Sequence, residues 1–236
     1  MRVQVQSAAG LVRRQAGPWT GSVHDLLSSL PDGIGPRPVS CDDQWEVVTW
    51  LPGSVGERPL SDDVRSDDAV VSVARLLRRF HDATGHAVCH NDVGPWNVVF
   101  DGADAVGLID WDLAGPGPSL ADVASAVWHF APLYDDAECV RVGWPAPPDR
   151  VQRVARFCHA YGLSMDDELW DAVAERMRWY RGQVLAARGA PARPGASPWL
   201  KVDPALVDAD MAFLARFLRT LHGGNSPGIA DVGRPG

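Results

Sequence analysis

The chain has 236 residues, of which 46% are hydrophobic, and a formal net charge of −8 at pH 7. This length can bury one large core or two lobes, while the acidic balance argues against nucleic acid as a partner and no apolar run approaches membrane-spanning length. The N-terminus lacks the apolar stretch of a secretory signal, and the four cysteines form no C-x-x-C pair, a pattern typical of reduced thiols in the cytoplasm.

The N-terminal quarter predicts strands around one helix. Residues 2–15 alternate apolar and polar side chains on both sides of Ala8-Ala9-Gly10, which indicates a hairpin. Thr20 or Ser22 can cap a helix with an apolar stripe that ends at residue 30. Residues 45–51 read as the clearest strand and stop at Pro52-Gly53. We therefore expect residues 1–52 to form a small lobe that contains β-strands.

The rest of the chain predicts mainly helices. Residues 53–65 have no periodic pattern and read as a linker, after which Ser66 caps a strong helix that ends at Gly85. Further helices are expected at residues 119–130, 148–161, 165–188 and 204–221. We expect residues 53–222 to form the larger lobe and the Gly- and Pro-rich residues 223–236 to form a flexible tail.

The most informative stretch runs from residue 89 to residue 120. It sets His90, Asp92 and Asn97 in the pattern H-x-D-x-x-x-x-N, with Asp110 thirteen residues after Asn97. Because Pro95 disfavours helix at the preceding residue, we expect a loop between Asp92 and the next strand. Two short apolar runs then predict a hairpin centred near residues 103 and 104.

This hairpin would bring two oxygen ligands together. With that centre Asn97 lies directly opposite Asp110, with Cβ atoms roughly 5 Å apart. An amide oxygen and a carboxylate suit magnesium when phosphate oxygens and waters complete its shell. Asp92 would stay available to accept a proton from a hydroxyl group. This pattern predicts a phosphoryl-transfer site; the alternative is a buried histidine beside capping Asp and Asn residues.

The same residues resemble the aminoglycoside phosphotransferase and choline kinase-like family of small-molecule kinases. The resemblance rests on His90-Asn91-Asp92 with Asn97 and on Ile109-Asp110-Trp111. Protein kinases instead carry an arginine before the aspartate and D-F-G at the metal segment. One departure is Asn91, where the family usually has glycine.

The resemblance implies a protein kinase-like two-lobe α+β fold, with a shortened β-containing N-lobe and a mainly helical C-lobe. It implies Asp92 as the catalytic base and Asn97 and Asp110 as magnesium ligands. His90 would be a structural support, and Asp122 would brace the catalytic loop from the next helix. From its position alone, Asp122 could equally be an acid that complements a helix dipole.

The nucleotide side departs most from the family, whose N-lobe has a Gly-rich loop, a strand lysine and a helix glutamate. The only lysine here is Lys201, so Arg13 or Arg14 would have to grip phosphate, with Asp25 or His24 as the partner. The arginines could equally mark a solvated strand end.

By resemblance the backbone of Thr49, Trp50 and Leu51 would meet the adenine. The alternative is a plain edge strand that ends in a turn at Pro52-Gly53. The lobe as a whole therefore makes nucleotide binding a weaker expectation than the catalytic loop.

The implied function is transfer of the γ-phosphoryl group of ATP, or of GTP, to a hydroxyl of a small molecule with magnesium as cofactor. The acceptor would be an antibiotic, an amino sugar or a related metabolite in a bacterial cytoplasm. The alternative is a catalytically weak or inactive nucleotide-binding pseudokinase. The sequence leaves open the acceptor, the choice between ATP and GTP, and the oligomeric state.

Overall fold

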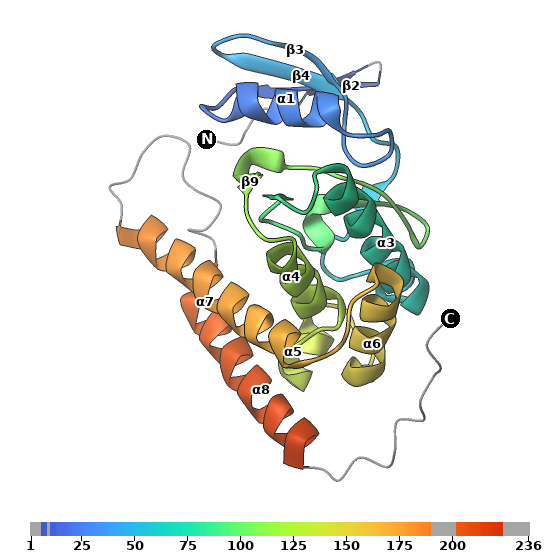
Figure 1. The fold of residues 1–236 in the computed structure, drawn as a ribbon, viewed down its shortest axis with the longest axis vertical. Helices are drawn as coiled ribbons and strands as arrows, with labels where there is room; N and C mark the ends of the chain where they lie inside the picture. The colour runs from blue at the N-terminus through green and yellow to red at the C-terminus, as the bar shows by residue number, and fades with distance from the viewer. Residues whose placement is uncertain (1–5, 9, 190–201, 224–236) are drawn as a thin grey trace.

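The computed structural model describes residues 6–8, 10–189 and 202–223. A small sheet with one helix lies above a larger, mainly helical part (Figure 1). The α+β prediction, with few strands first and helices after them, is confirmed. The tail expected at residues 223–236 lies, from residue 224 on, outside the described residues.

The upper part is a four-stranded antiparallel sheet in the order β1-β2-β4-β3. Its strands are β1 (Gln6–Ala8), β2 (Leu11–Gln15), β3 (Pro38–Cys41) and β4 (Trp45–Thr49). The β1–β2 hairpin confirms the predicted turn, although residues 2–5 lie outside the described residues.

Helix α1 (Thr20–Ser29) covers this sheet, with Val23 and Leu27 almost fully buried. Neither of the expected residues caps it: the N-cap is Trp19, without a side-chain cap. The Thr20 hydroxyl instead accepts a hydrogen bond from the Gly17 backbone N–H at 3.0 Å.

The lower part is built from helices that pack around α4. They are α2 (Asp62–Arg65), α3 (Asp67–Ala83), α4 (Leu120–Phe130), α5 (Asp136–Arg141), α6 (Arg150–Tyr161), α7 (Asp167–Gly189) and α8 (Pro204–Gly223). Helix α3 packs against α6, α4 against α7, and α7 against α8. The Ser66 hydroxyl caps α3 as predicted, since it accepts a hydrogen bond from the Ala69 N–H at 3.0 Å.

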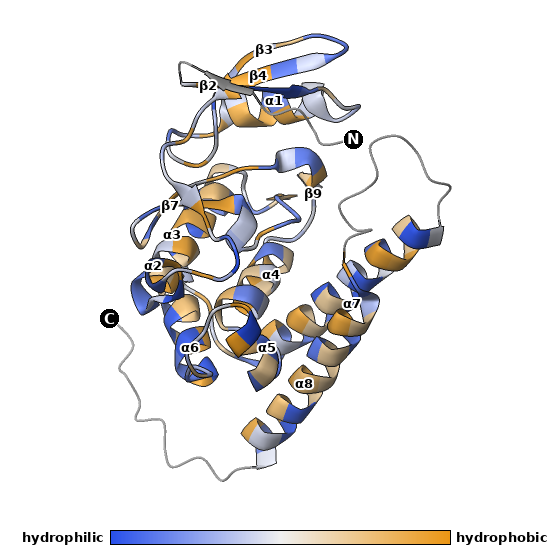
Figure 2. Cartoon of the chain, turned by 180° about the vertical axis from the view of Figure 1, so that it is seen from behind, coloured by the Kyte–Doolittle hydropathy of each residue, from blue (hydrophilic) through white to orange (hydrophobic). Residues whose placement is uncertain are grey.

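Figure 2 shows hydrophilic and hydrophobic residues mixed along both α7 and α8. No helix in the described ranges is long and apolar enough to cross a membrane.

Short strands carry the loops of the site. They are β5 (Ser54–Val55), β6 (Val88–Cys89), β7 (Val98–Asp101), β8 (Asp104–Leu108) and β9 (Gly115–Pro116). Strands β7 and β8 form the predicted hairpin, but its register shifts after Val99. The turn is centred at residues 102 and 103, with Asp101 opposite Asp104, one residue before the predicted centre. The bulge makes up only half of the resulting offset, so Val98 pairs with Leu108, and Asn97 lies opposite Ile109 and not opposite Asp110 as predicted.

The expected loop after Asp92 is also wrong in part. Pro95–Asn97 form a short 3-10 helix, η1, with the proline at its start. Proline suits this position because its fixed φ matches the helix and it has no N–H to leave unpaired.

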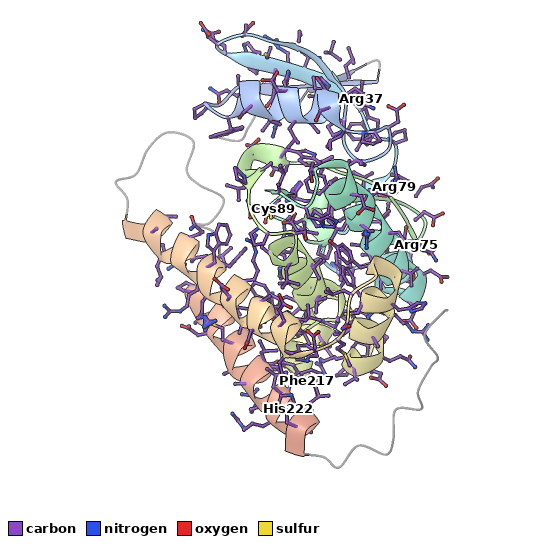
Figure 3. The ribbon with its side chains drawn as sticks, viewed as in Figure 1. Arg37, Arg75, Arg79, Cys89, Phe217 and His222 are labelled. Atoms are coloured by element: carbon purple, nitrogen blue, oxygen red, sulfur yellow. The ribbon has the colours of Figure 1, made fainter. Side chains whose placement is uncertain are left out.

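The two parts are joined by polar contacts on the side of α3. The Arg79 guanidinium donates to the Asp32 and Gly33 carbonyls at 2.9 and 3.2 Å, and Figure 3 shows Arg79 on α3 below Arg37 of the upper part. The Leu108 N–H donates to the Ile34 carbonyl at 2.7 Å. The hairpin that precedes Asp110 is thus tied directly to the upper part.

Candidate active site

Asp122 fixes the start of the H-x-D-x-x-x-x-N loop. It is fully buried in the first turn of α4 and accepts hydrogen bonds from the backbone N–H groups of His90 (2.6 Å) and Asn91 (2.8 Å). Its carboxylate also lies 3.2 Å from Nε2 of buried His81. Burial favours the neutral acid, but hydrogen bonds and the neighbouring histidines lower the pKa of Asp122. The loop backbone is therefore held by a buried carboxylate.

His90 links this loop to the metal segment. It is fully buried, and its Nε2 donates to the Ile109 carbonyl at 2.9 Å. The same ring accepts, at Nδ1, a bond from the Asp92 N–H at 3.3 Å. Its ring meets Trp111 edge-on, with centroids 4.6 Å apart. His90 thus sets the spacing between Asp92 and the residue before Asp110 through contacts to the protein itself.

The Asp92 carboxylate is oriented by Asn97. The Asn97 amide donates to the Asp92 carboxylate at 2.7 Å and to the Asp92 carbonyl at 2.9 Å. Burial and the nearby charge of Asp110 raise the pKa of Asp92, while His90, Asn97 and Trp96 oppose this shift. A fixed carboxylate with a raised pKa is a suitable acceptor for a proton near neutral pH.

Asp110 follows the hairpin in a left-handed conformation, with φ of +61°. A short 3-10 helix, η2 (Trp111–Leu113), begins directly after it. An aspartate tolerates this backbone better than most residues because its short polar side chain fits there. The turn leaves its carboxylate half-exposed.

Asn97 and Asp110 fit a magnesium ion. Both Asn97 amide bonds go to Asp92, so the amide oxygen is the atom left for a cation. No cluster of three His, Cys, Asp or Glu side chains suited to a metal occurs in the described parts of the chain. Two oxygen ligands are nevertheless sufficient for magnesium, which keeps waters and binds substrate phosphates.

Arg14 of β2 reaches these carboxylates from the upper part. Its guanidinium lies 2.7 Å from Asp112 and 3.3 Å from Asp110, and its Nε lies 2.7 Å from Glu46. Burial opposes the charge, but the three carboxylates together raise the pKa of Arg14. Arg13 points to the other face of the strand, where its guanidinium lies over the Trp45 ring at 4.0 Å. Of the two candidate arginines, only Arg14 lies at the site.

The partner of Arg14 comes from a strand. Glu46 of β4 is directly opposite Arg14 in the sheet and almost fully buried. Its other oxygen lies 3.0 Å from Nε2 of His24 on α1. The expected helix partner, His24 or Asp25, therefore does not touch Arg14, and His24 acts on it only through Glu46. The alternation of Glu46 with Val48 on the buried face of one strand was the signal that could have predicted this.

Asn91 ties the catalytic loop to its surroundings. It has φ of +65°, and its amide donates to the Leu113 carbonyl at 3.1 Å. Arg176 of α7 is buried and donates to the Asn91 backbone carbonyl and, at 3.4 Å, to its side-chain oxygen. Asparagine tolerates the left-handed backbone that glycine adopts freely, and it adds these contacts.

At the end of β4, two backbone N–H groups already donate hydrogen bonds within the protein. The Thr49 N–H donates to the Arg37 carbonyl and the Trp50 N–H to the Gly10 carbonyl, both at 2.8 Å. These bonds commit two of the three amides expected to meet adenine. The Trp50 side chain is 47% exposed.

A cavity of about 770 Å³ opens beside Asp92, and its lining includes Asp110 and Asp112. From there it extends along α4, α5, α7 and α8, whose lining residues include His129, Glu138, Tyr180 and Asp210. This volume is in the range that accommodates small-molecule ligands.

Sequence comparison explains this arrangement. The profile of the phosphotransferase enzyme family matches residues 85–180, which contain the whole catalytic loop and the metal segment. The chain is also 31% identical over 191 residues to the trifolitoxin immunity protein of Rhizobium leguminosarum bv. trifolii, covering 69% of this chain and 72% of that protein. The chain belongs to the phosphotransferase enzyme family. It is thus a phosphotransferase of the class that acts on hydroxyl groups of small molecules, and the resemblance found in the sequence is confirmed.

Solved structures agree on the fold of this phosphotransferase. A choline/ethanolamine kinase family protein from Mesorhizobium loti superposes with a TM-score of 0.59 and 13% identity over 94% of this chain and 85% of that one. Plasmodium vivax ethanolamine kinase gives 0.54 and 11% over 93% and 82%. At these identities the likeness concerns the fold alone, and it confirms the kinase-like fold.

Sequence reasoning missed four residues that the phosphotransferase brings to the site. They are Glu46, Arg176, His129 and Asp210. In the sequence both Arg176 and Asp210 lie within stretches that predict helices, and nothing local marks them as part of a site. Only their packing against the catalytic loop and α4 shows where they lie.

Proposed function

We propose that this phosphotransferase moves the γ-phosphoryl group of ATP or GTP to a hydroxyl of a small molecule, with Asp92 as the base. The observation that carries the proposal is the Asp92 carboxylate, which lines the cavity, is oriented by Asn97 and has a pKa raised by burial. An acceptor hydroxyl bound against it would lose its proton to Asp92 as the phosphoryl group arrives. The reaction depends mainly on positioning and charge.

Asn97 and Asp110 would hold the magnesium ion. When bound, this ion neutralises phosphate charge and helps to align the transferred group. Asn97 contributes twice, because one end of its amide orients Asp92 while the other end faces the metal position. Support for this pair comes from the chemistry of its oxygen donors.

Arg14 would bind the phosphates in place of the family's lysine. Its planar guanidinium can donate two parallel hydrogen bonds to a phosphate, which a lysine cannot do. Glu46 would keep it in place, and the nucleotide would replace its contacts with Asp110 and Asp112. Of Thr49, Trp50 and Leu51, the first two donate their backbone N–H groups to the protein itself. Leu51 would therefore be the residue that contacts the adenine.

We further propose residues 1–52 and 53–222 as the two lobes. Directly after the proposed boundary, Ser54 pairs with Phe100 of β7, so the chain joins the lower part there. The bases and phosphates would then bind between the lobes, in the cytoplasm where these nucleotides are available.

The acceptor is proposed to be an antibiotic or a related metabolite. Support comes from the relative that is named for immunity to trifolitoxin. Phosphorylation of a toxic molecule is one way in which a phosphotransferase could confer such protection.

The test combines binding with turnover. Purified protein is assayed for ADP release and for a phosphorylated product by ³¹P NMR, against a panel of hydroxylated antibiotics and metabolites. Asp92→Asn should lower kcat by about 10² to 10⁴ while calorimetry shows nearly unchanged affinity for magnesium–ATP. The matched control is Asp101→Asn at the exposed end of β7, which should retain full turnover. Full turnover in Asp92→Asn would refute the assignment of the base, and the absence of both ATP and GTP binding would refute the kinase reaction.

A further inference from the structure

The cavity beside Asp92 has an aromatic wall. Its residues are Trp96 of η1, Trp128 of α4, Tyr134 of the loop between α4 and α5, and Tyr180 of α7. The Trp128 and Tyr180 rings meet edge-on, with centroids 5.4 Å apart. The Trp128 and Tyr134 side chains are almost fully buried. The contact between Trp128 and Tyr180 keeps both rings in position, so this wall of the cavity is formed before a ligand binds.

Helix α8 adds apolar side chains on the other side. Leu206 and Val207 line the same cavity and face it from the first turn of α8, which lies against α7 (Figure 1). A ligand between these walls would bury apolar area on two sides. An aliphatic amino alcohol of three or four heavy atoms would leave most of this surface unused.

The charges of this part of the cavity nearly cancel. Glu138 is paired with Arg141 at 2.5 Å and with Arg58 at 3.6 Å. Asp210 is different: within the described residues no basic group lies in an ion pair with it, and Trp128 Nε1 donates to it at 3.0 Å. Because burial raises the pKa of Asp210 to about 7, its carboxyl group is ionised at pH 8, where it would pair with one cationic group; Arg58 and Arg141 beside it disfavour a second cationic group there.

His129 supplies a second polar anchor. It is 7% exposed, lines the cavity, and its Nε2 has no hydrogen-bond partner among the described residues. Burial, with Arg58 and Arg176 nearby, lowers the pKa of His129 to about 3, so the ring is neutral. The Trp96 ring meets it edge-on at 4.7 Å and fixes its orientation. A buried nitrogen without a partner is costly, and a hydroxyl or amide of a ligand would satisfy it.

We propose that the acceptor is a ring-bearing alcohol with at most one cationic group, which stacks on Trp96, pairs with Asp210 and hydrogen-bonds to His129. This inference rests on the proposed function, since it assigns the acceptor side of the same site. It excludes polycationic amino sugars and small aliphatic amino alcohols as good acceptors.

The binding test uses four probes at pH 8, where Asp210 is ionised, without nucleotide. Binding is measured by tryptophan fluorescence, because Trp96 and Trp128 line the cavity. The probes are 2-amino-1-phenylethanol, the neutral 1-phenyl-1,2-ethanediol, ethanolamine, and an amino sugar with four amines. The phenyl amino alcohol should bind about tenfold tighter than each of the last two, which corresponds to about 1.4 kcal/mol. Equal or weaker binding of the phenyl amino alcohol would overturn the proposal.

Two variants separate the anchors. Asp210→Asn should abolish the preference for the phenyl amino alcohol over the neutral diol and leave the diol unchanged. His129→Phe should weaken both phenyl probes about tenfold and leave their ratio unchanged. The matched control is Asp208→Asn, on the same helix but exposed and paired with Arg181 outside the cavity. A preference that survives Asp210→Asn would refute the role of Asp210.

Turnover distinguishes this inference from the proposed function. If amino sugars are phosphorylated in an Asp92-dependent reaction and phenyl alcohols are not, the proposed function stands and the acceptor class is wrong. If the phenyl probes bind as expected but no hydroxyl is phosphorylated, the acceptor site stands and the proposed function fails.

Discussion

The loop that carries Asp92 and the strand β2 that carries Arg14 are held in different ways. The backbone of the loop is fixed by one buried acid, Asp122, which accepts hydrogen bonds from the N–H groups of His90 and Asn91. Arg14 is held by its side chain, between Glu46 of the neighbouring strand and the carboxylates of Asp110 and Asp112. The loop is therefore held by contacts within the protein, whereas in the proposed function Arg14 would exchange Asp110 and Asp112 for phosphate.

This difference shows which half of the site can vary. Backbone anchoring demands an acid at one place in α4 and leaves the side chain of Asn91 free to differ from the family's glycine, while His90, Asp92 and Asn97 keep the family pattern. Side-chain anchoring can use any carboxylate that the sheet brings near, and here a strand glutamate replaces the helix glutamate of the family. The residues around Arg14 accordingly differ more from the family pattern than the loop does, where Asn91 is the one departure noted.

The largest effect is expected from Asp122→Ala, which removes the anchor of the loop. Two backbone N–H groups and His81 would lose a charged acceptor in a fully buried place. We expect a loss of about 3 kcal/mol in the free energy of unfolding and no measurable turnover. Urea unfolding and the ADP-release assay measure both. Unchanged stability would show that the loop does not depend on this acid.

Substitution of Arg14 or Glu46 should affect magnesium–ATP binding more than the free energy of unfolding. Arg14→Ala should weaken magnesium–ATP binding about 30-fold, or about 2 kcal/mol, in calorimetry. Glu46→Gln should give part of this loss, and the double variant should be less than additive because the two side chains touch. Arg13→Ala is the control, since Arg13 stacks on Trp45 away from the site. Strict additivity would argue against positioning by Glu46.

Asp210 is a partly buried acid without either kind of anchor, and its pH dependence should show this. Burial raises its pKa to about 7, against the Trp128 bond and Arg58, with Glu138 and Asp135 adding to the rise. The folded state therefore holds a proton that the unfolded state has lost, and stability falls as the pH rises from about 4 to about 7.

Asp210→Asn removes this loss. Compared with the wild type, the variant should gain up to about 2 kcal/mol at pH 8 and much less at pH 5, after allowance for water in the open cavity. Thermal unfolding at several pH values measures the difference. A gain that is the same at pH 5 and pH 8 would show that Asp210 does not titrate in this way.

The smallest effect is expected from Asn91→Gly, which restores the family's usual residue. Glycine accepts φ of +65° without strain, so the free energy of unfolding should change by less than about 1 kcal/mol. The loss of contacts to Leu113 and Arg176 should lower kcat about threefold and leave the affinity for magnesium–ATP unchanged. Steady-state kinetics and calorimetry separate the two. A kcat equal to that of the wild type would make Asn91 a neutral exchange.

The parts of the site that are close in sequence were predictable. His90, Asp92 and Asn97 sit within one loop, and spacing alone indicated their chemistry. The approach of Asp110 was predicted one residue out of register, because the turn is centred one residue earlier than the apolar runs indicated and the bulge after Val99 makes up only part of the difference. The long helices α3, α4, α6, α7 and α8 were predicted from periodicity, and the Ser66 cap was correct. Helix α5 was not predicted, and residues 53–65, predicted to be a linker, contain β5 and α2, which are too short to show a period.

The sequence by itself determined the family, the α+β order of elements and the residues of the catalytic loop, because those signals lie in local spacing and in hydrophobic period. Only the tertiary structure decided that Glu46 holds Arg14, that Arg176 holds Asn91, and that His129 and Asp210 share one cavity. Each of these pairs is at least thirty residues apart along the chain, and their partners are chosen by strand register and helix packing. No local pattern encodes which of many similar carboxylates and arginines the folded chain brings together.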